Sequence, residues 1–247
     1  ALQIAQLLIL EYAGVARRIY SGELDSVVVP DVLDKTNEFY TKYTDAKNIQ
    51  YINWQQAEHT FPTDLNRNTN ACAYRGMPYI SDCSFDAAGS ILQHILPGAP
   101  LKPRDLNWQK WGQLYQFDQE EFAGSKFENS GLGKEGFLYI PYNCALKDNC
   151  RVHVAFHGCS QSKMFLGDTY VKNTGYLEWA GPNNLIVLFP QATAVSQVND
   201  HGCWDFFGFT QNYLTKDGVQ ASAIRQMGGD FNNRINDFSF GWGFGVL

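Results

Sequence analysis

The stretch RVHVAFHGC, residues 151–159, decides the fold class of this sequence. It begins as a run of apolar and β-branched residues and ends in a glycine turn, which is typical of a buried strand. A helical stretch from Met164 to Ala180 follows, and then a second buried run, NNLIVLFPQA, at residues 183–192. Parallel strands joined by helices form a sheet that helices cover on both faces. We therefore predict an α/β fold.

A strand–helix–strand pattern also lies nearer the start of the sequence. RRIYSGELD, residues 17–25, predicts a short strand that ends in a turn, and NIQYINW, residues 48–54, predicts another strand. Between them, residues 30–46 carry a rough apolar stripe at helical spacing behind Pro30, a residue suited to the first position of a helix. This is the pattern of a βαβ unit.

The other segments give weaker patterns. In chain order, we predict a helix over 1–18, a stapled loop over 64–84, a helix over 86–96, irregular structure over 97–135, a strand over 136–141, a turn over 143–150 and a last helix over 217–228. We find no repeat and no sign of a second domain. We therefore expect residues 1–247 to form a single domain.

Composition and charge argue against two classes of protein. The 247 residues are enough for one sizeable α/β domain with a core of its own. The formal net charge is −6 and no basic run is present, so nucleic-acid binding has little electrostatic support. No uninterrupted apolar stretch reaches the roughly 18 residues that a membrane-spanning helix needs. We expect neither nucleic acid nor a membrane as a partner.

The cysteines indicate disulfides and an oxidising compartment. Their number is even, and they include two close pairs. Many pairings are possible, and the sequence alone leaves the pairing open. Zinc binding is the competing interpretation, but no CxxC pair exists and no histidine lies at zinc-finger spacing. We therefore expect no metal.

Candidate catalytic residues follow three predicted strands. Functional groups in open α/β sheets collect on loops at the carboxyl ends of strands. Asp25 and His59 follow two strands that one helix separates, which is the acid–base half of an α/β-hydrolase triad. The turn at residues 157–159, His-Gly-Cys, resembles the oxyanion loop of that fold, where backbone N–H groups face developing negative charge.

The order of these groups differs from that of an ordinary α/β-hydrolase. In that fold the oxyanion strand comes first, and the nucleophile, the acid and the histidine follow. Here Asp25 and His59 precede the oxyanion strand. A circular permutation produces this order and puts the nucleophile upstream of Asp25.

The sequence resembles the extracellular poly(3-hydroxybutyrate) depolymerases, specifically their circularly permuted fungal type. The resemblance covers roughly residues 15–225. It rests on stretches that occur in order along the chain: HTFPTD, PYISDCSFDAAG, GFLYIP, HVAFHGCSQS, NTGY with EWA, LFPQA and GCWDF.

This resemblance implies a function and a set of site residues. His59 is then the triad histidine, Asp25 is the triad acid, and the backbone N–H of Cys159 faces the oxyanion. The resemblance also implies a secreted enzyme that cleaves esters of short hydroxyalkanoates without a cofactor, and we expect a monomer. It implies the disulfides Cys72–Cys83, Cys144–Cys150 and Cys159–Cys203.

The sequence departs from the family at the nucleophile. The family serine lies in a GLSSGG-like elbow upstream of Asp25, but only 24 residues precede Asp25 here and none of the 247 residues completes a G-x-S-x-G motif. We therefore expect a hydrolase fold that is incomplete at its amino end, from a chain that begins inside a longer product and is inactive alone. Ser160 is the alternative nucleophile, although its setting lacks the elbow glycines.

Each assignment has a plainer alternative. Asp25 has an alternative as a capping residue, with Asp31 and Asp34 as spare acids. His59 has an alternative as a solvated loop residue. Aromatic side chains beside the site either fill the core or grip an apolar polymer: Trp204, Phe206, Phe207 and Phe209. Among the other histidines, His94 and His153 fit structural or surface roles, and His201 is ambiguous.

Two other functions remain open at this point. One is a related secreted carboxylesterase that acts on feruloyl or acetyl esters of plant walls. The other is a non-catalytic remnant that only binds polymer or a partner.

Overall fold

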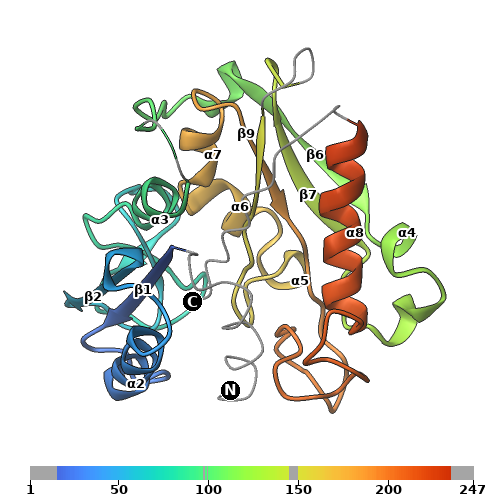
Figure 1. Cartoon of the computed structure of the whole chain (residues 1–247), viewed down its shortest axis with the longest axis horizontal. Helices are drawn as coiled ribbons and strands as arrows, with labels where there is room; N and C mark the ends of the chain where they lie inside the picture. Colours follow the sequence, from blue (N-terminus) through green and yellow to red (C-terminus); the bar gives the residue numbers. More distant parts are fainter. Residues whose placement is uncertain (1–15, 97, 99, 145–149, 235–247) are drawn as a thin grey trace. The chain divides into compact units, whose positions relative to one another are not determined.

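The structure is a computed structural model that describes residues 16–96, 98, 100–144 and 150–234 (Figure 1). The described chain forms two compact units. The first unit contains residues up to 100 together with 173–175, and the second contains 101–172 and the residues from 176 onward. Each unit is described by itself. The expectation of a single domain stays a prediction.

The first unit contains the predicted βαβ pattern. Strand β1 (Arg17–Gly22) pairs in parallel with β2 (Ile49–Gln55), and α2 (Pro30–Thr41) connects them with Pro30 at its start. A short 3-10 helix, Ala46–Asn48, takes the last part of the predicted helix. Ile19 and Ile52 are buried between the strands and their covering helices.

A close approach at the end of β1 fixes the loop that follows. A Cβ atom at Gly22 would lie 2.3 Å from the carbonyl oxygen of Ala57, so only glycine fits there. The N–H of Leu24 donates to the same oxygen at 3.0 Å. The chain after β1 therefore lies directly against the chain after β2.

A small parallel sheet completes the first unit. Its order is β3 (Phe61–Thr63), β5 (Ile80–Asp82) and β4 (Asn70–Ala71), and the disulfide Cys72–Cys83 joins the ends of the last two strands. The predicted staple over residues 64–84 is present, but the segment contains β4 and β5 and is not only a loop. Strands of two or three residues are too short to show an alternating pattern.

Helix α3 (Ala87–Ile95) packs against β1 and β3, close to the predicted bounds. Asp86 caps it by accepting a hydrogen bond from the N–H of Gly89 at 2.8 Å. Its apolar face, including Ala88 and Leu92, is fully buried. Figure 1 shows α2 and α3 beside the β1–β2 pair.

The second unit is built on a mixed four-stranded sheet. Its order is β6 (Gly112–Asp118), β7 (Glu135–Pro141), β9 (Leu185–Phe189) and β8 (Arg151–Val154). The β8–β9 pair is parallel as predicted, whereas β7 runs antiparallel to both of its neighbours. Every residue of β9 is buried, because it lies in the centre of the sheet.

Strand β6 lies in a region that the sequence analysis predicted to be irregular, and that prediction was wrong. It is an edge strand, so several of its side chains are exposed and its apolar pattern is weak. The same region holds three short helices, namely Trp108–Lys110, α4 (Glu120–Ala123) and Gly124–Asn129.

The single helical stretch predicted for residues 164–180 is three short helices. They are α5 (Lys163–Leu166), α6 (Thr169–Asn173) and α7 (Tyr176–Ala180). Gly167 and Gly175 separate them with φ angles of +60° and +95°, a backbone conformation that ends a helix.

The last helix, α8 (Val219–Arg234), covers the sheet of the second unit and contacts β8 and α4 (Figure 1). Its buried residues Ala223, Ile224 and Met227 pack with Leu138 and Leu188 of the sheet. An α/β fold is therefore confirmed.

Two predicted features fall largely outside the described residues. They are the helix over 1–18 and the turn over 143–150. Among the described residues, no helix is both long and apolar enough to cross a membrane. The same residues contain no group of three or more His, Cys, Asp and Glu side chains placed to hold a metal ion.

Candidate active site

The first unit brings Asp25 and His59 together. Asp25 lies three residues after β1, and His59 lies in the loop between β2 and β3. The His59 Nδ1 and Asp25 Oδ2 atoms are 2.9 Å apart. A carboxylate only accepts, so Nδ1 carries the proton and Nε2 is left with a lone pair. The histidine side chain is 41% exposed and the carboxylate 12% exposed, so the acid is shielded while the base remains accessible.

The backbone fixes the other oxygen of Asp25. Its Oδ1 accepts hydrogen bonds from the N–H groups of Val27 at 2.9 Å and Val28 at 2.8 Å. The carboxylate therefore cannot rotate without losing these bonds, and its orientation toward His59 is set before any substrate binds. Asp25 therefore forms a turn with the backbone that follows it and also pairs with the histidine, and α2 has no side-chain cap.

The spare acids of the sequence analysis have other surroundings. Asp34 Oδ1 accepts a hydrogen bond from the hydroxyl of Tyr51 at 2.6 Å. Desolvation of this phenol, with the hydrogen bond and charge of Asp34, raises the pKa of Tyr51 to about 12. Asp31 is exposed in the first turn of α2. The Asp25 assignment is therefore favoured over both.

Glu58 is a neighbour that the sequence analysis missed. Its Oε2 accepts hydrogen bonds from the N–H groups of His59 at 2.8 Å and Ser26 at 3.3 Å, so it bridges the acid loop and the histidine loop. Arg75 adds positive charge and donates to the Ser26 hydroxyl at 2.9 Å. Desolvation works to raise the Glu58 pKa, but the two hydrogen bonds and Arg75 outweigh it and hold that pKa below its usual range.

The histidine loop is also tied to the small sheet. The Glu58 N–H donates to the carbonyl of Cys72 at 3.0 Å, and the Cys83 N–H donates to the carbonyl of Thr63 at 2.8 Å. The Cys72–Cys83 disulfide joins the residue that contacts Glu58 to the residue that contacts Thr63. These contacts form a frame that supports the loop beneath His59.

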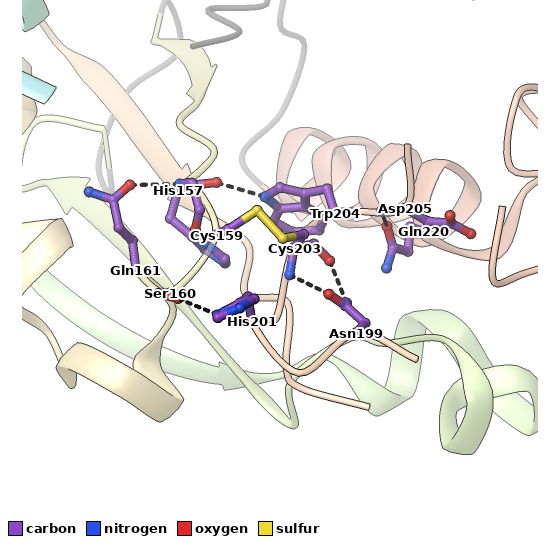
Figure 2. Close-up of a disulfide and its surroundings, with 11 residues drawn as sticks. His157, Cys159, Ser160, Gln161, Asn199, His201, Cys203, Trp204, Asp205 and Gln220 are labelled. Carbon is purple, nitrogen blue, oxygen red and sulfur yellow. Dashed lines mark hydrogen bonds between the residues drawn. A yellow bond between two sulfur atoms is a disulfide. The ribbon is translucent and has the colours of Figure 1, made fainter. Parts of the chain in front are cut away.

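The second unit contains the predicted oxyanion loop (Figure 2). The chain leaves β8 and turns at Gly158 and Cys159, which are both exposed. The disulfide Cys159–Cys203 ties this turn to the loop before Trp204. With Cys144–Cys150, the structure has the three disulfides that the family resemblance implies.

His157 lies at the base of the same loop and differs from His59 in its burial and in the partners of its ring. It is 2% exposed, and both of its ring nitrogens contact backbone groups. Nδ1 is 2.7 Å from the carbonyl oxygen of Gly158, and Nε2 accepts a hydrogen bond from the Ala192 N–H at 3.0 Å. Burial lowers the His157 pKa to about 4, although the contact with the Gly158 carbonyl opposes the change. His157 is therefore neutral near pH 7 and holds the loop.

Comparison with known proteins identifies the family. No family model matches the chain. It is 38% identical over 212 residues to the poly(3-hydroxybutyrate) depolymerase of Delftia acidovorans, an alignment that covers 85% of this chain and 41% of the relative. It is 35% identical over 223 residues to the polyhydroxybutyrate depolymerase of Talaromyces funiculosus, covering 84% of this chain and 64% of the relative.

Solved structures give the same answer. The crystal structure of the PHB depolymerase from Penicillium funiculosum matches with a TM-score of 0.76 at 34% identity, covering 84% of this chain and 67% of that one. The chain belongs to the poly(3-hydroxybutyrate) depolymerase family. A serine-to-alanine variant of a PHB depolymerase, solved in complex with an R3HB trimer, matches with a TM-score of 0.75 and the same coverage.

The chain spans 41% and 64% of the lengths of the two curated depolymerases. The sequence identities show that the chain belongs to the family. Because it covers only part of these relatives, its activity is a proposal. Circular permutation stays a prediction.

The aromatic residues near Cys203 of this depolymerase-family chain have two kinds of surroundings. Trp204 packs edge-on against Phe156 and donates from Nε1 to the carbonyl of His157 at 3.0 Å, so it supports the oxyanion loop. Phe206 and Phe207 are 61% and 46% exposed. Of the four aromatic residues that could grip a polymer, we favour Trp204 and Phe207 as substrate-binding. Trp204 has a structural contact, and Phe207 presents its ring to solvent.

Asp205 shapes the exposed aromatic loop and was also missed by the sequence analysis. Its carboxylate accepts from the N–H groups of Gly208, Phe209 and Thr210 and from the Thr210 hydroxyl, at 2.7–3.1 Å. Its own N–H donates to Gln220 of α8 at 2.8 Å. An aspartate followed by exposed aromatics and a glycine, DFFG, is the only sequence signal for this role.

The remaining candidates have modest settings. Ser160 has a φ of +60° and places its hydroxyl oxygen 3.2 Å from Nδ1 of His201, which gives the ambiguous His201 a contact. His153 is buried on β8 beside Tyr176, which fits the structural role predicted for it. His94 contacts the carbonyl of Asn48 at 3.1 Å.

Proposed function

We propose that this chain carries the acid–base pair and the oxyanion loop of a serine-type ester hydrolase that degrades poly(3-hydroxybutyrate). The observation that carries the proposal is the Asp25–His59 pair, in which a fixed carboxylate orients the imidazole and the histidine side chain is 41% exposed. Family membership supports the polyester as substrate.

In the proposed mechanism, His59 Nε2 takes the proton of a serine hydroxyl as the serine oxygen attacks the ester carbonyl. Asp25 stabilises the imidazolium that forms, and the Cys159 N–H donates to the oxyanion of the tetrahedral intermediate. The intermediate collapses as His59 passes the proton to the leaving alcohol. Water then attacks the acyl-enzyme with His59 as base, which releases a carboxylic acid and restores the serine.

The nucleophile is proposed to lie outside these 247 residues, none of which completes a G-x-S-x-G motif. Labelling of the folded chain with a fluorophosphonate, followed by intact mass and peptide mapping, tests this. We expect no serine adduct. An adduct on Ser160 would instead favour the Ser160–His201 contact as a second reactive site.

Activity is tested by supplying the missing part. The chain is fused to the portion of the Talaromyces funiculosus relative that the chain does not match, and release of 3-hydroxybutyrate from a polymer film is measured. We expect the fusion to hydrolyse the film. A fusion that binds the film but neither hydrolyses it nor takes up the fluorophosphonate would support the polymer-binding alternative.

The finer substrate assignment rests on the exposed rings of Phe206 and Phe207, which suit an apolar polyester surface. Competition between the film and soluble feruloyl or acetyl esters separates a depolymerase from a plant-wall esterase. We propose that the protein is extracellular, which its three disulfides support. We also propose that it is a monomer, which sedimentation analysis tests.

A further inference from the structure

The peptide between Gly158 and Cys159 supplies the N–H that is proposed to face the oxyanion. A trans peptide is planar, and its carbonyl and N–H point in opposite directions. Among the described residues the only cis peptide is Met77–Pro78, so this peptide is trans. Whatever holds the carbonyl oxygen of Gly158 therefore sets the direction of the Cys159 N–H.

His157 holds that oxygen. Its Nδ1 is 2.7 Å from the Gly158 carbonyl, and a carbonyl oxygen only accepts, so Nδ1 must carry the proton. The Ala192 N–H donates to Nε2 at 3.0 Å, so Nε2 must be unprotonated. The two contacts together select a single neutral tautomer. The N–H of Gln161 also donates to the Gly158 oxygen, at 3.2 Å.

The ring of His157 is fixed by its packing. It lies against the rings of Trp204 and Tyr170, with centroid separations of 5.2 Å and 6.2 Å. Figure 2 shows the indole of Trp204 hydrogen-bonded to the carbonyl of His157. The imidazole therefore cannot turn away from Gly158 without disturbing Trp204.

The Cys159 N–H itself is available. Cys159 is exposed, and its N–H makes no hydrogen bond to any other residue that the structure describes. Hydrogen bonds to the carbonyl end of a peptide also polarise it and strengthen its N–H as a donor. We call the hydrogen bond from His157 Nδ1 to the Gly158 carbonyl the clamp. It sets the direction of the Cys159 N–H and strengthens that N–H as a hydrogen-bond donor.

We propose that His157 is a positioning residue that aims the Cys159 N–H at the oxyanion by holding the Gly158 carbonyl. This inference rests on the proposed function, in which Cys159 is the donor. A histidine that merely fills the core would stabilise the fold without determining the direction of one N–H.

Two substitutions of His157 each keep one of the two hydrogen bonds that its ring makes. In His157→Asn, the amide N–H lies near the position of Nδ1 and preserves the donor to Gly158. In His157→Gln, the amide oxygen lies near the position of Nε2 and preserves the acceptor for Ala192, while the donor to Gly158 is lost. Both replace an imidazole by an amide, so each is the control for the other.

The direction of the N–H is measured by residual dipolar couplings of the 247-residue chain, with the amides of β7 and β9 as the reference frame. We expect His157→Gln to change the Cys159 coupling and lower its order parameter while the sheet couplings stay the same. We expect His157→Asn to keep the wild-type values. An unchanged Cys159 coupling in His157→Gln, or an equal change in both variants, would overturn the proposal.

The wild-type chain provides a test that does not depend on folding of a variant. The ¹⁵N shifts of the His157 ring report which nitrogen carries the proton. Protonation at Nδ1 supports the clamp, and protonation at Nε2 would exclude it.

Turnover by the fusion protein gives the functional readout. We expect His157→Gln to lower kcat by about tenfold to a hundredfold with KM unchanged, because one oxyanion donor is misdirected, and His157→Asn to restore most of it. If the wild-type fusion shows no turnover, the proposed function fails, but the couplings and the ring shifts still decide whether His157 aims the N–H.

Discussion

His59 and His157 occupy similar positions in the sequence and do opposite work. Each follows a strand, and each ring nitrogen Nδ1 has an oxygen partner within 3 Å. His59 faces a carboxylate and leaves Nε2 accessible, whereas His157 is buried and has Nε2 satisfied by the backbone of Ala192. The comparison teaches that the partner of the second nitrogen separates a histidine proposed to carry a proton from a structural one.

The surroundings of the two histidines reinforce this difference. Around His59 lie charged groups, namely Asp25, Glu58 and Arg75. Around His157 lie aromatic rings and backbone amides. Burial among uncharged groups disfavours the protonated form of the His157 imidazole.

The largest expected effect is on catalysis at His59. We expect His59→Ala and Asp25→Asn in the fusion protein to lower kcat for film hydrolysis by about 10³- to 10⁴-fold, because the general base or its orienting acid is lost. The pair is partly exposed, so the free energy of unfolding should change little. Lys35→Ala, at an exposed ion pair with Glu38, is the control and should keep full activity.

The pair would lose its assigned role if His59→Ala kept more than about a tenth of the wild-type kcat. Circular dichroism of each variant shows whether a loss reflects misfolding.

The disulfides beside the two histidines should differ in their effect on stability. The chain-entropy model gives about 4 kcal/mol for the loop closed by Cys159–Cys203 and about 3 kcal/mol for that closed by Cys72–Cys83, because the separations are 44 and 11 residues. Urea unfolding of the two paired Cys→Ser variants measures the difference. A larger loss for the Cys72–Cys83 pair would show that the frame beneath His59 contributes more than its loop length predicts.

Acid should destabilise the fold through the buried histidines. Burial lowers the pKa of both His157 and His153 from 6.5 to about 4, so the unfolded chain binds protons more readily between these values. Their contribution to stability is therefore complete above about pH 6.5 and is lost as the pH falls toward 4. The loss approaches about 3 kcal/mol for each histidine.

His153 allows a direct test of that dependence. Its Nε2 has no hydrogen-bond partner among the described residues, so His153→Leu removes a titrating group without breaking a bond at that atom. We expect this variant to lose about half of the acid sensitivity in urea unfolding at pH 7 and pH 5. Val152→Ala, on the same strand, should lower stability equally at both values. Equal acid sensitivity in His153→Leu and wild type would contradict the assignment of this sensitivity to the buried histidines.

The smallest effect is expected at Glu58. In Glu58→Gln the side-chain oxygen still accepts from His59 and Ser26, and only the charge is lost. We expect the free energy of unfolding to change by less than about 1 kcal/mol, since the group is near water. Film hydrolysis by the fusion should fall only a few-fold. A loss as large as that of His59→Ala would place Glu58 in the catalytic machinery itself.

The elements that the sequence predicted well have strong patterns of their own. The helix between β1 and β2 begins at a proline, β9 is apolar throughout, and α3 begins after a capping aspartate. The elements that it missed have weak patterns. Strand β6 is an exposed edge, and β4 and β5 are too short to alternate. Gly167 and Gly175 divide a stretch that was predicted as a single helical run.

The residues of the candidate site also divide into those that the sequence predicted and those that it missed. Asp25 and His59 were predicted because each follows a strand and has a chemistry that its position can use, and the role of Cys159 was implied by the family resemblance. Glu58 and Asp205 were missed because their partners are backbone N–H groups, which every residue type provides and no motif reports.

The sequence by itself determined the α/β class, the family and the residues of the acid–base pair, because these follow from residue type and from position along the chain. Only the tertiary structure decided what each histidine does. The group that locks Nε2 of His157 is the N–H of Ala192, 35 residues away, and the proton on a ring nitrogen is fixed by the atom that faces it in space. Residue spacing cannot specify that atom, since every residue except proline carries the same N–H.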